Sequence, residues 1–227
     1  AVGTLHRNIQ IIHIKFRFSF SVFFLYVDSY MGLGDKIAYL WTIPSLAMLL
    51  FMPVWHYLCS NYNRHRMWSI SAFIGSSLML VIWFFEPGPA SFIPYLILFS
   101  LFQMNSSAGW IANDGMKGDI IDFDLLKTGV NRAGQYNALS SIVTKANLGL
   151  GGALGFFSLK VFGFDPASDT HDALAAFGMK ATVSLVPAIL FVSSAIVIWF
   201  FPIDMRRQKV IKRRLDARAE RQQGAAT

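Results

Sequence analysis

Polar side chains occur at helical spacing inside a long apolar segment in the second half of the chain, and one of them is a lysine. Asn137, Ser141 and Lys145 are spaced four residues apart, which places them on one face of a helix. A lysine at the centre of a membrane-spanning helix costs about 2.5–3.5 kcal/mol on insertion scales, so a compensating partner is expected. Ser140 and Thr144 add hydroxyl groups beside this face. We interpret the helix as the lining of a hydrophilic path, with a structural ion pair for Lys145 as the alternative.

A second polar face precedes this one. Gln103, Ser106 or Ser107, Trp110 and Asp114 recur at helical spacing. An aromatic ring beside hydroxyl, amide and ammonium groups suits a hydroxylated ligand, because C–H faces stack on the ring and polar edges form hydrogen bonds. Two interpretations of Trp110 are open, because it lies near the end of its segment: a platform for a ligand, or an anchor at the membrane interface.

The elements that must position these residues are apolar and long. Of the 227 residues, 54% are hydrophobic and only 15% are charged, whereas soluble domains carry about 25% charged residues. Stretches of roughly 20 apolar residues match the thickness of a bilayer core. The sequence therefore predicts an all-α membrane protein. Six transmembrane helices are expected at Phe16–Leu33, Ala38–Leu58, Met67–Phe85, Phe92–Ala112, Tyr136–Phe162 and Ala181–Phe201, with interfacial tryptophans at Trp41, Trp55, Trp68, Trp83 and Trp199.

The distribution of basic residues predicts the orientation. If the N-terminus lies inside, 16 of the 20 Lys and Arg residues fall on the inner side, whereas the outer loops hold only Lys36 and Lys180. This asymmetry predicts an inner-membrane protein with both termini in the cytoplasm. Residues 1–204 would form the bundle and residues 205–227 a basic cytoplasmic tail. We expect the tail to bind anionic lipid rather than nucleic acid, because it directly follows a span.

Asp28 is a further charge within a predicted span. Three interpretations are open: a group that neutralises Lys145 or takes up a proton during coupling, a mid-span residue that faces the cavity, or a residue at the span boundary. No signature of a hydrolase, a metalloprotease or a phosphate-binding loop is present, so an enzyme is not expected. No cofactor is expected either.

A charged loop is expected after the fourth span. It contains Asp119, Asp122 and Asp124, followed by Lys127 and Arg132. The acids can pair with these bases or with charges on a neighbouring helix. A metal site is the weaker alternative, because no His or Cys lies nearby. We therefore predict a cytoplasmic charge network that opens and closes, formed by Asp119, Asp122, Asp124 and Arg132.

This stretch resembles the glycoside–pentoside–hexuronide:cation symporter family of the major facilitator superfamily. Its members carry an Asp-x-x-Asp-Tyr pattern and then a Thr-Gly-x-x-Arg-x-x-Gly-like run between helices ten and eleven. Here Phe123 stands where Tyr is usual. The resemblance is specific over residues 105–155 and looser elsewhere, and it implies the C-terminal six helices of a twelve-helix transporter.

The resemblance also implies roles for individual residues. Lys145 matches a helix-eleven lysine at the sugar site that influences cation coupling, and Trp110 matches a helix-ten tryptophan that packs on the sugar. Ser140 and Ser141 stand where a relative has polar residues facing sugar, although the residue types differ. The substrate-binding set expected is Lys145, Trp110, Ser140, Ser141, Asn137 and Thr144, and the matched acids of the charge network are Asp119 and Asp122.

The expected function is therefore sugar or glycoside symport with Na⁺ or H⁺ by alternating access. The resemblance places the cation site and most sugar contacts on an N-terminal half, which this chain lacks. We expect a trimmed start or a fragment, since the chain begins at Ala1, and we expect no transport by this chain alone. Alternatives are a half-length non-transporting membrane subunit, a gene remnant, or a lipid or lysolipid carrier. The expected partners are the lipid bilayer, a small hydroxylated solute such as a glycoside, and the missing six-helix half.

Overall fold

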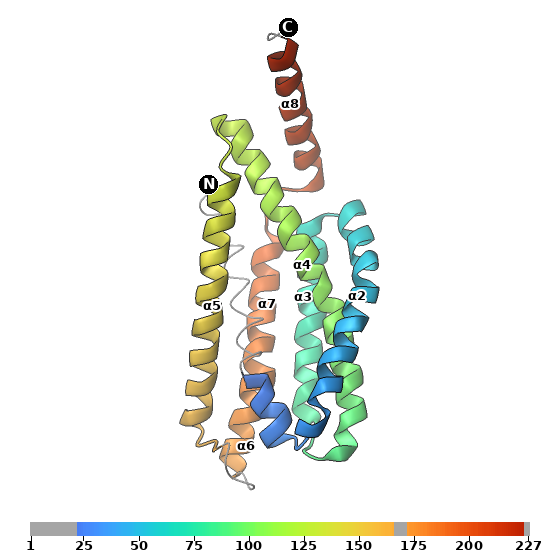
Figure 1. Ribbon diagram of the computed structural model, residues 1–227, viewed down its shortest axis with the longest axis vertical. Helices are drawn as coiled ribbons and strands as arrows, with labels where there is room; N and C mark the ends of the chain where they lie inside the picture. Colours follow the sequence, from blue (N-terminus) through green and yellow to red (C-terminus); the bar gives the residue numbers. More distant parts are fainter. Residues whose placement is uncertain (1–21, 166–171, 225–227) are drawn as a thin grey trace.

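The computed structural model describes residues 22–165 and 172–224, and it folds them as helices joined by short turns (Figure 1). No strand occurs within those two ranges. A helical turn at 22–25 leads into the first element named. In chain order the elements are η1 (Tyr26–Tyr30), η2 (Gly34–Lys36), α2 (Ile37–Asn61), α3 (Arg64–Val81), η3 (Ile82–Phe84), η4 (Pro89–Ser91), α4 (Phe92–Thr128), α5 (Ala133–Val161), α6 (Ala173–Lys180), η5 (Ala181–Leu185), α7 (Val186–Trp199) and α8 (Met205–Gly224).

The membrane character predicted from the sequence is confirmed. Within the described residues, 4 helical segments are long and apolar enough to cross a membrane, and they correspond to the second, third, fifth and sixth predicted spans. α4 is long enough, but polar residues such as Gln103 and Asn105 lower its mean hydropathy. The first predicted span, 16–33, begins outside the described residues. The number of six transmembrane helices therefore stays a prediction. The four segments are Gly34–Asn61, Arg64–Phe84, Ala133–Val161 and Ala173–Trp199.

The charged loop predicted after the fourth span is wrong, because α4 continues through it as one helix of 37 residues. Apolar residues at helical spacing in this extension, Met116 and Ile120, are buried in a cluster with Ile211 of α8. The helix ends at Gly129, which adopts a φ of 74° and donates its N–H to the Leu125 carbonyl at 2.9 Å. Glycine suits this left-handed position because it has no Cβ.

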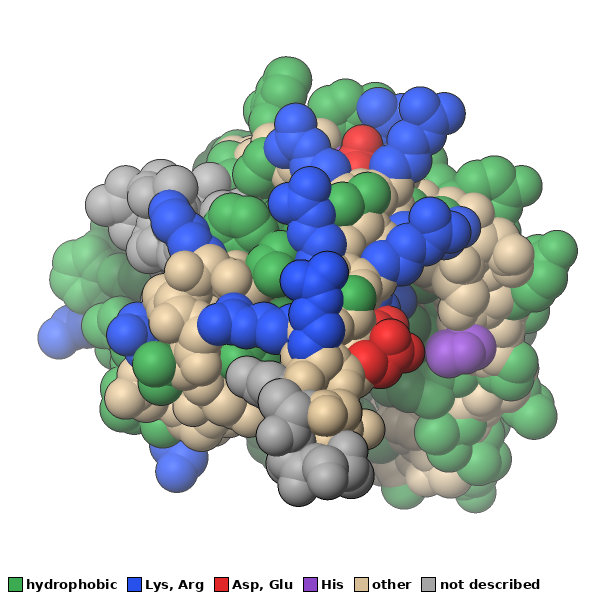
Figure 2. Space-filling view, turned by 90° about the horizontal axis from the view of Figure 1, so that it is seen from above, with side chains coloured by type: hydrophobic (Ala, Val, Ile, Leu, Met, Phe, Trp, Pro, Cys, Tyr) green, Lys and Arg blue, Asp and Glu red, His purple; other side chains and the backbone are tan. Residues whose placement is uncertain are grey.

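The basic tail also folds as a helix, α8. It extends beyond the bundle along the long axis of the molecule and packs against α4 (Figure 1). The backbone N–H of Met205 donates to Asn63 Oδ1 at 3.0 Å, which holds the start of α8 against the start of α3. Basic side chains are spread over this end of the molecule (Figure 2). Lipid binding by the tail stays a prediction. Because the helix rises about 1.5 Å per residue along this axis, its first turn is best placed to reach headgroups.

Close helix packing positions the central elements. α4 lies between α2 and α3, and α3 packs in turn on α7. Small buried residues form the α3–α7 contact: Ser69 Oγ donates to the Ala195 carbonyl at 2.7 Å, and Ser76 Oγ donates to the Ala188 carbonyl at 3.0 Å. Such small residues allow helix backbones to approach closely in membranes. α5 contacts α4, α6 and η5, which leaves its middle facing a cavity.

Candidate functional site

A cavity of about 670 Å³ lies between α3, α4, α5 and α7. Ligand sites for small molecules commonly measure 300–1,000 Å³, so its size suits a small solute. Aromatic rings, amides and hydroxyl groups line it together. The lining residues are Trp68, Ser71, Ala72, Phe102, Asn105, Ser106, Gly109, Trp110, Asn113, Asp114, Lys117, Asn137, Ser140, Ser141, Thr144, Lys145, Leu148 and Phe191.

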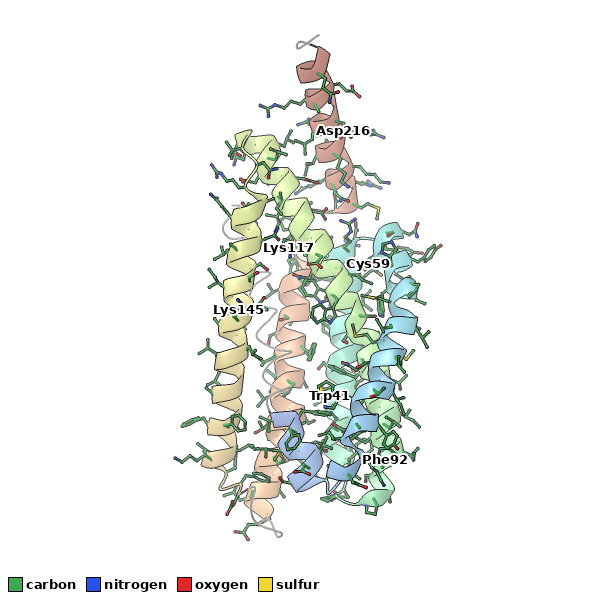
Figure 3. The ribbon with its side chains drawn as sticks, in the orientation of Figure 1. Trp41, Cys59, Phe92, Lys117, Lys145 and Asp216 are labelled. Atoms are coloured by element: carbon green, nitrogen blue, oxygen red, sulfur yellow. The ribbon has the colours of Figure 1, made fainter. Side chains whose placement is uncertain are left out.

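The structure brings all six residues of the predicted substrate-binding set to this cavity. Five of them lie on α5, and Lys145 stands about halfway along that helix (Figure 3). The sixth residue, Trp110, lies on α4, and 51% of its surface is exposed. Helical spacing explains this convergence, because successive turns of α5 present one face to the cavity. Whether these residues bind a solute stays a prediction.

The α4 wall differs in part from the predicted polar face. Ser106, Trp110 and Asp114 line the cavity as expected, whereas Gln103 and Ser107 are buried elsewhere. Ser107 Oγ donates to the Met104 carbonyl at 2.7 Å, which satisfies it within α4. The missed members of this wall include Asn105, Asn113 and Lys117. Asn113 follows Trp110 by three residues and fits the same helical spacing, and a longer window would have included Lys117.

The two lysines of the cavity differ in their partners. Lys117 Nζ lies 3.0 Å from Asp114 Oδ1, so its charge is compensated nearby. Lys145 forms no ion pair with any residue in the described ranges. The structural ion pair considered for Lys145 is therefore not formed within the described part of this chain. The cavity keeps an available ammonium group on its α5 wall.

The α3 wall contributes residues that sequence reasoning missed. Trp68 was expected at the interface, but the structure buries it to 7% exposure, and it lines the cavity with Ser71. Gly109 explains the close approach of α4, since a Cβ there would lie 2.9 Å from Trp68 Nε1. This contact between helices distant in sequence has no local signal. The burial of Trp68 is therefore decided by tertiary packing.

At the α8 end, Asp119 is the centre of a separate charged cluster. Arg64 Nη1 of α3 donates to Asp119 Oδ1 at 2.9 Å, and Gln208 of α8 donates to the same oxygen. Burial raises the pKa of the Asp119 carboxyl above its ordinary value, and Arg64 opposes this shift. Asp119 thus pairs with a charge on a neighbouring helix. Neither Arg64 nor Gln208 belonged to the predicted set.

The remaining members of the predicted network are spread out. Asp122 is partly exposed and lies close enough to Asp119 to raise its pKa further. Asp124 is buried at 4% exposure and forms a hydrogen bond with Tyr136 of α5. Arg132 is exposed and forms no ion pair within the described residues. In the same part of the chain, no group of three His, Cys, Asp or Glu residues is placed to hold a metal ion. A charge network that opens and closes stays a prediction.

Asp28 lies away from the cavity. It is exposed on η1, and its side chain lies against Gly34 of η2. It is not among the residues that line the cavity beside Lys145. A role for Asp28 in coupling stays a prediction, without support from proximity to Lys145 in this structure.

A family model described as MFS/sugar transport protein matches residues 13–205 of the chain. The chain belongs to this family, a branch of the major facilitator superfamily. The match includes every wall of the cavity and the Arg64–Asp119 ion pair. The family resemblance inferred from the charged segment is therefore confirmed, and a transporter family accords with the expectation that the chain is not an enzyme.

Among curated proteins, this MFS/sugar transport family member is similar to an uncharacterized symporter of Synechocystis sp., with 25% identity over 88% of this chain and 38% of the relative. An uncharacterized symporter of Bacillus subtilis is 24% identical over 87% of this chain and 42% of the relative. A glucuronide carrier protein homolog of Escherichia coli is 26% identical over 48% of this chain and 23% of the relative. The matched part of the chain thus spans less than half the length of each of these relatives.

Proposed function

We propose that this chain forms one half of the solute path of a secondary active transporter that carries a sugar or glycoside together with Na⁺ or H⁺. The observation that carries the proposal is the cavity between α3, α4, α5 and α7, where Trp110 and several hydroxyl side chains converge with Lys145 from the middle of α5. Solute sites of secondary transporters lie at this depth, near the bilayer midplane. The family match and the relatives named as symporters support the same function.

The chemistry of the cavity favours a hydroxylated solute. Trp110 offers a flat apolar surface to the C–H groups of a sugar ring. Around Lys145, the α5 wall carries Asn137, Ser140, Ser141 and Thr144, which can donate to and accept from hydroxyl groups. An apolar wall beside Lys145 would instead favour a lipid or lysolipid carrier. The hydroxyl and amide groups beside Lys145 therefore support a glycoside.

A second six-helix half completes the path in this proposal. The relatives that match most of this chain are more than twice as long, since it covers 38% and 42% of them. The coupling site for the cation lies on that other half, and alternating access moves the two halves relative to each other. In this arrangement, Lys145 faces either the solute or the cation site of the partner half.

In the membrane, the end that carries α8 lies in the cytoplasm. The basic side chains gathered at this end support this orientation through the positive-inside rule (Figure 2). The α8 helix then lies on the cytoplasmic side of the inner membrane. The cluster of Arg64, Asp119 and Gln208 lies on the same side, where it stabilises the cytoplasmic ends of α3 and α4.

Tryptophan fluorescence tests binding directly, because Trp68 and Trp110 line the cavity. The chain in lipid nanodiscs is titrated with para-nitrophenyl α-galactoside and para-nitrophenyl β-glucuronide, whose nitrophenyl groups quench tryptophan. We expect quenching that an unlabelled methyl glycoside displaces. Lys145→Ala should weaken binding about tenfold, because a charge-assisted hydrogen bond is lost. Lys160→Ala is the matched control, since Lys160 is exposed on the same helix outside the cavity.

Equal affinities for Lys145→Ala and Lys160→Ala, or quenching that no glycoside displaces, would contradict the proposal. Uptake into liposomes tests the need for a partner half. The 227-residue chain should bind without transporting, and cation-driven uptake by this chain alone would overturn that part of the proposal. Displacement of the nitrophenyl quencher by a lysolipid, but not by a methyl glycoside, would favour the lipid carrier.

A further inference from the structure

Asn105 is a buried polar residue at the wall of the cavity with an unsatisfied oxygen atom. It lies on α4 at 8% exposure and lines the cavity. Its Oδ1 atom is closed to bulk solvent and has no hydrogen-bond partner among the described residues. A buried acceptor without a donor destabilises its surroundings, so a donor is expected to reach it.

The orientation of this amide is fixed by α3. Asn105 Nδ2 donates to the Ser71 carbonyl at 2.8 Å, and Ser71 Oγ donates in return to the Asn105 carbonyl at 3.0 Å. If the amide were flipped, its oxygen would face the Ser71 carbonyl oxygen, and two acceptors would meet. The amide nitrogen is therefore hydrogen-bonded to α3, and the amide oxygen is the atom that stays without a partner.

The neighbours of the amide supply no donor to Oδ1. A Cβ at Gly75 would lie 3.3 Å from Asn105 Nδ2 and 3.7 Å from ring atoms of Phe102 and Phe191. Both rings also line the cavity. A side chain at Gly75 would press on the amide nitrogen, so the glycine lets the Asn105 amide keep its contact with α3. A donor for Oδ1 is therefore expected from the cavity that Asn105 lines.

We propose that Asn105 is a specificity-determining residue of the cavity, whose amide oxygen accepts a hydrogen bond from a hydroxyl group of the solute. This inference rests on the proposed function. An amide oxygen only accepts, so this position favours an O–H donor and rejects a carboxylate or a phosphate. Lys145 on the α5 wall only donates. Asn105 Oδ1 and the Lys145 ammonium group therefore offer opposite hydrogen-bonding character to the solute, and together they set the orientation in which a sugar binds.

Two substitutions separate binding from packing. Asn105→Ala removes the acceptor, whereas Ser71→Ala disturbs the same α3–α4 contact but keeps the Asn105 amide and the backbone carbonyl that holds it. Ser71 also lines the cavity, but its hydroxyl group already donates to the Asn105 carbonyl and is not offered to the solute. Binding of para-nitrophenyl α-galactoside is measured by tryptophan quenching in nanodiscs. We expect Asn105→Ala to weaken binding about three- to tenfold, as for one neutral hydrogen bond, and Ser71→Ala to change it less than about twofold.

A ligand series keeps the test informative if Asn105→Ala folds poorly. Each monodeoxy derivative of the galactoside lacks one hydroxyl donor, and one of them should bind the wild-type chain about three- to tenfold more weakly. In a double-mutant cycle, the loss of affinity caused by removing this hydroxyl should disappear in Asn105→Ala and persist in Ser71→Ala.

The outcomes separate this inference from the proposed function. In one outcome, the wild-type chain binds glycosides and Lys145→Ala weakens this binding, but every deoxy derivative loses as much affinity in Asn105→Ala as in the wild type. The assignment of Asn105 is then overturned and the proposed function stands. Equal loss in Asn105→Ala and Ser71→Ala would also overturn it, because packing alone would then explain the effect. If no glycoside binds the wild-type chain, the proposed function fails and the assignment fails with it.

Discussion

The ion pair between Arg64 and Asp119 makes an asymmetric prediction about stability. Asp119 is 6% exposed, whereas the Arg64 side chain is 30% exposed. Burial raises the pKa of Asp119 although Arg64 lies 2.9 Å away, so desolvation outweighs the attraction. The buried site thus favours a neutral group over a carboxylate, and the two partners should respond differently to removal.

Arg64→Ala leaves a buried carboxylate with Gln208 as its remaining donor among the described contacts. Breaking a fully buried pair in this way costs about 3–5 kcal/mol, and the partial exposure of Arg64 reduces this to about 2–3 kcal/mol. Asp119→Asn removes the charge and keeps the shape and an acceptor, so we expect a change of less than about 1 kcal/mol. The double variant should be more stable than Arg64→Ala, because the unpaired charge is gone.

The raised pKa of Asp119 also gives the sign of the pH dependence. The folded state binds the proton more tightly than the unfolded state, whose carboxyl group has the ordinary pKa of 3.8. The protonated form therefore contributes stability that is fully present below pH 3.8 and is lost as the pH rises through the folded pKa. Relative to Asp119→Asn, the wild-type chain should lose stability over this window. Arg64→Ala should extend the window to higher pH.

Cys59 provides the assay. It is the single cysteine of the chain, it is buried at 2% exposure, and it belongs to the same apolar cluster as Met116 and Ile120 of α4. A thiol-reactive dye therefore reports thermal unfolding of this end in detergent. At about 2–4 °C per kcal/mol, Arg64→Ala should lower the midpoint by about 5–10 °C at neutral pH and Asp119→Asn by less than about 4 °C. Equal losses for both variants would show that the carboxylate is favoured at this site, and the reasoning would be refuted.

Two glycines give further predictions by the same thiol assay. Gly109→Ala should lower the midpoint and weaken glycoside binding, because its Cβ would lie 2.9 Å from Trp68 Nε1 at the cavity wall, and overpacking costs about 1–3 kcal/mol. Gly178→Ala should lower the midpoint at least as much, because its Cβ would overlap the Phe162 side chain. Gly118→Ala is the control for both, since nothing lies within 4 Å of its Cβ; it should be neutral or stabilise α4 by about 0.5–1 kcal/mol. Midpoints that fall equally in all three variants would contradict the packing argument.

Several properties of this protein follow from the sequence alone. Long apolar runs determine the membrane helices. In lipid, every backbone N–H and C=O group needs a hydrogen-bond partner within the protein, and a helix supplies these partners within a single segment. Helical spacing places Asn137, Ser141 and Lys145 on one face of α5. The charged segment indicates the family, and the family model confirms it. These features are local, since they depend on residues within a few turns of one another.

Tertiary structure decided the rest. The extension of α4 beyond residue 112 has the composition of a loop, yet it stays helical because α8 covers its apolar side. Asn105 and Ser71 are 34 residues apart, and Arg64 and Asp119 are 55 apart, so no local pattern predicts that they meet. Lys145 was recognised from the sequence because a charge in an apolar helix is a one-residue signal. Its lack of a partner within the described chain, and the acceptor on the opposite wall, depend on how the helices pack.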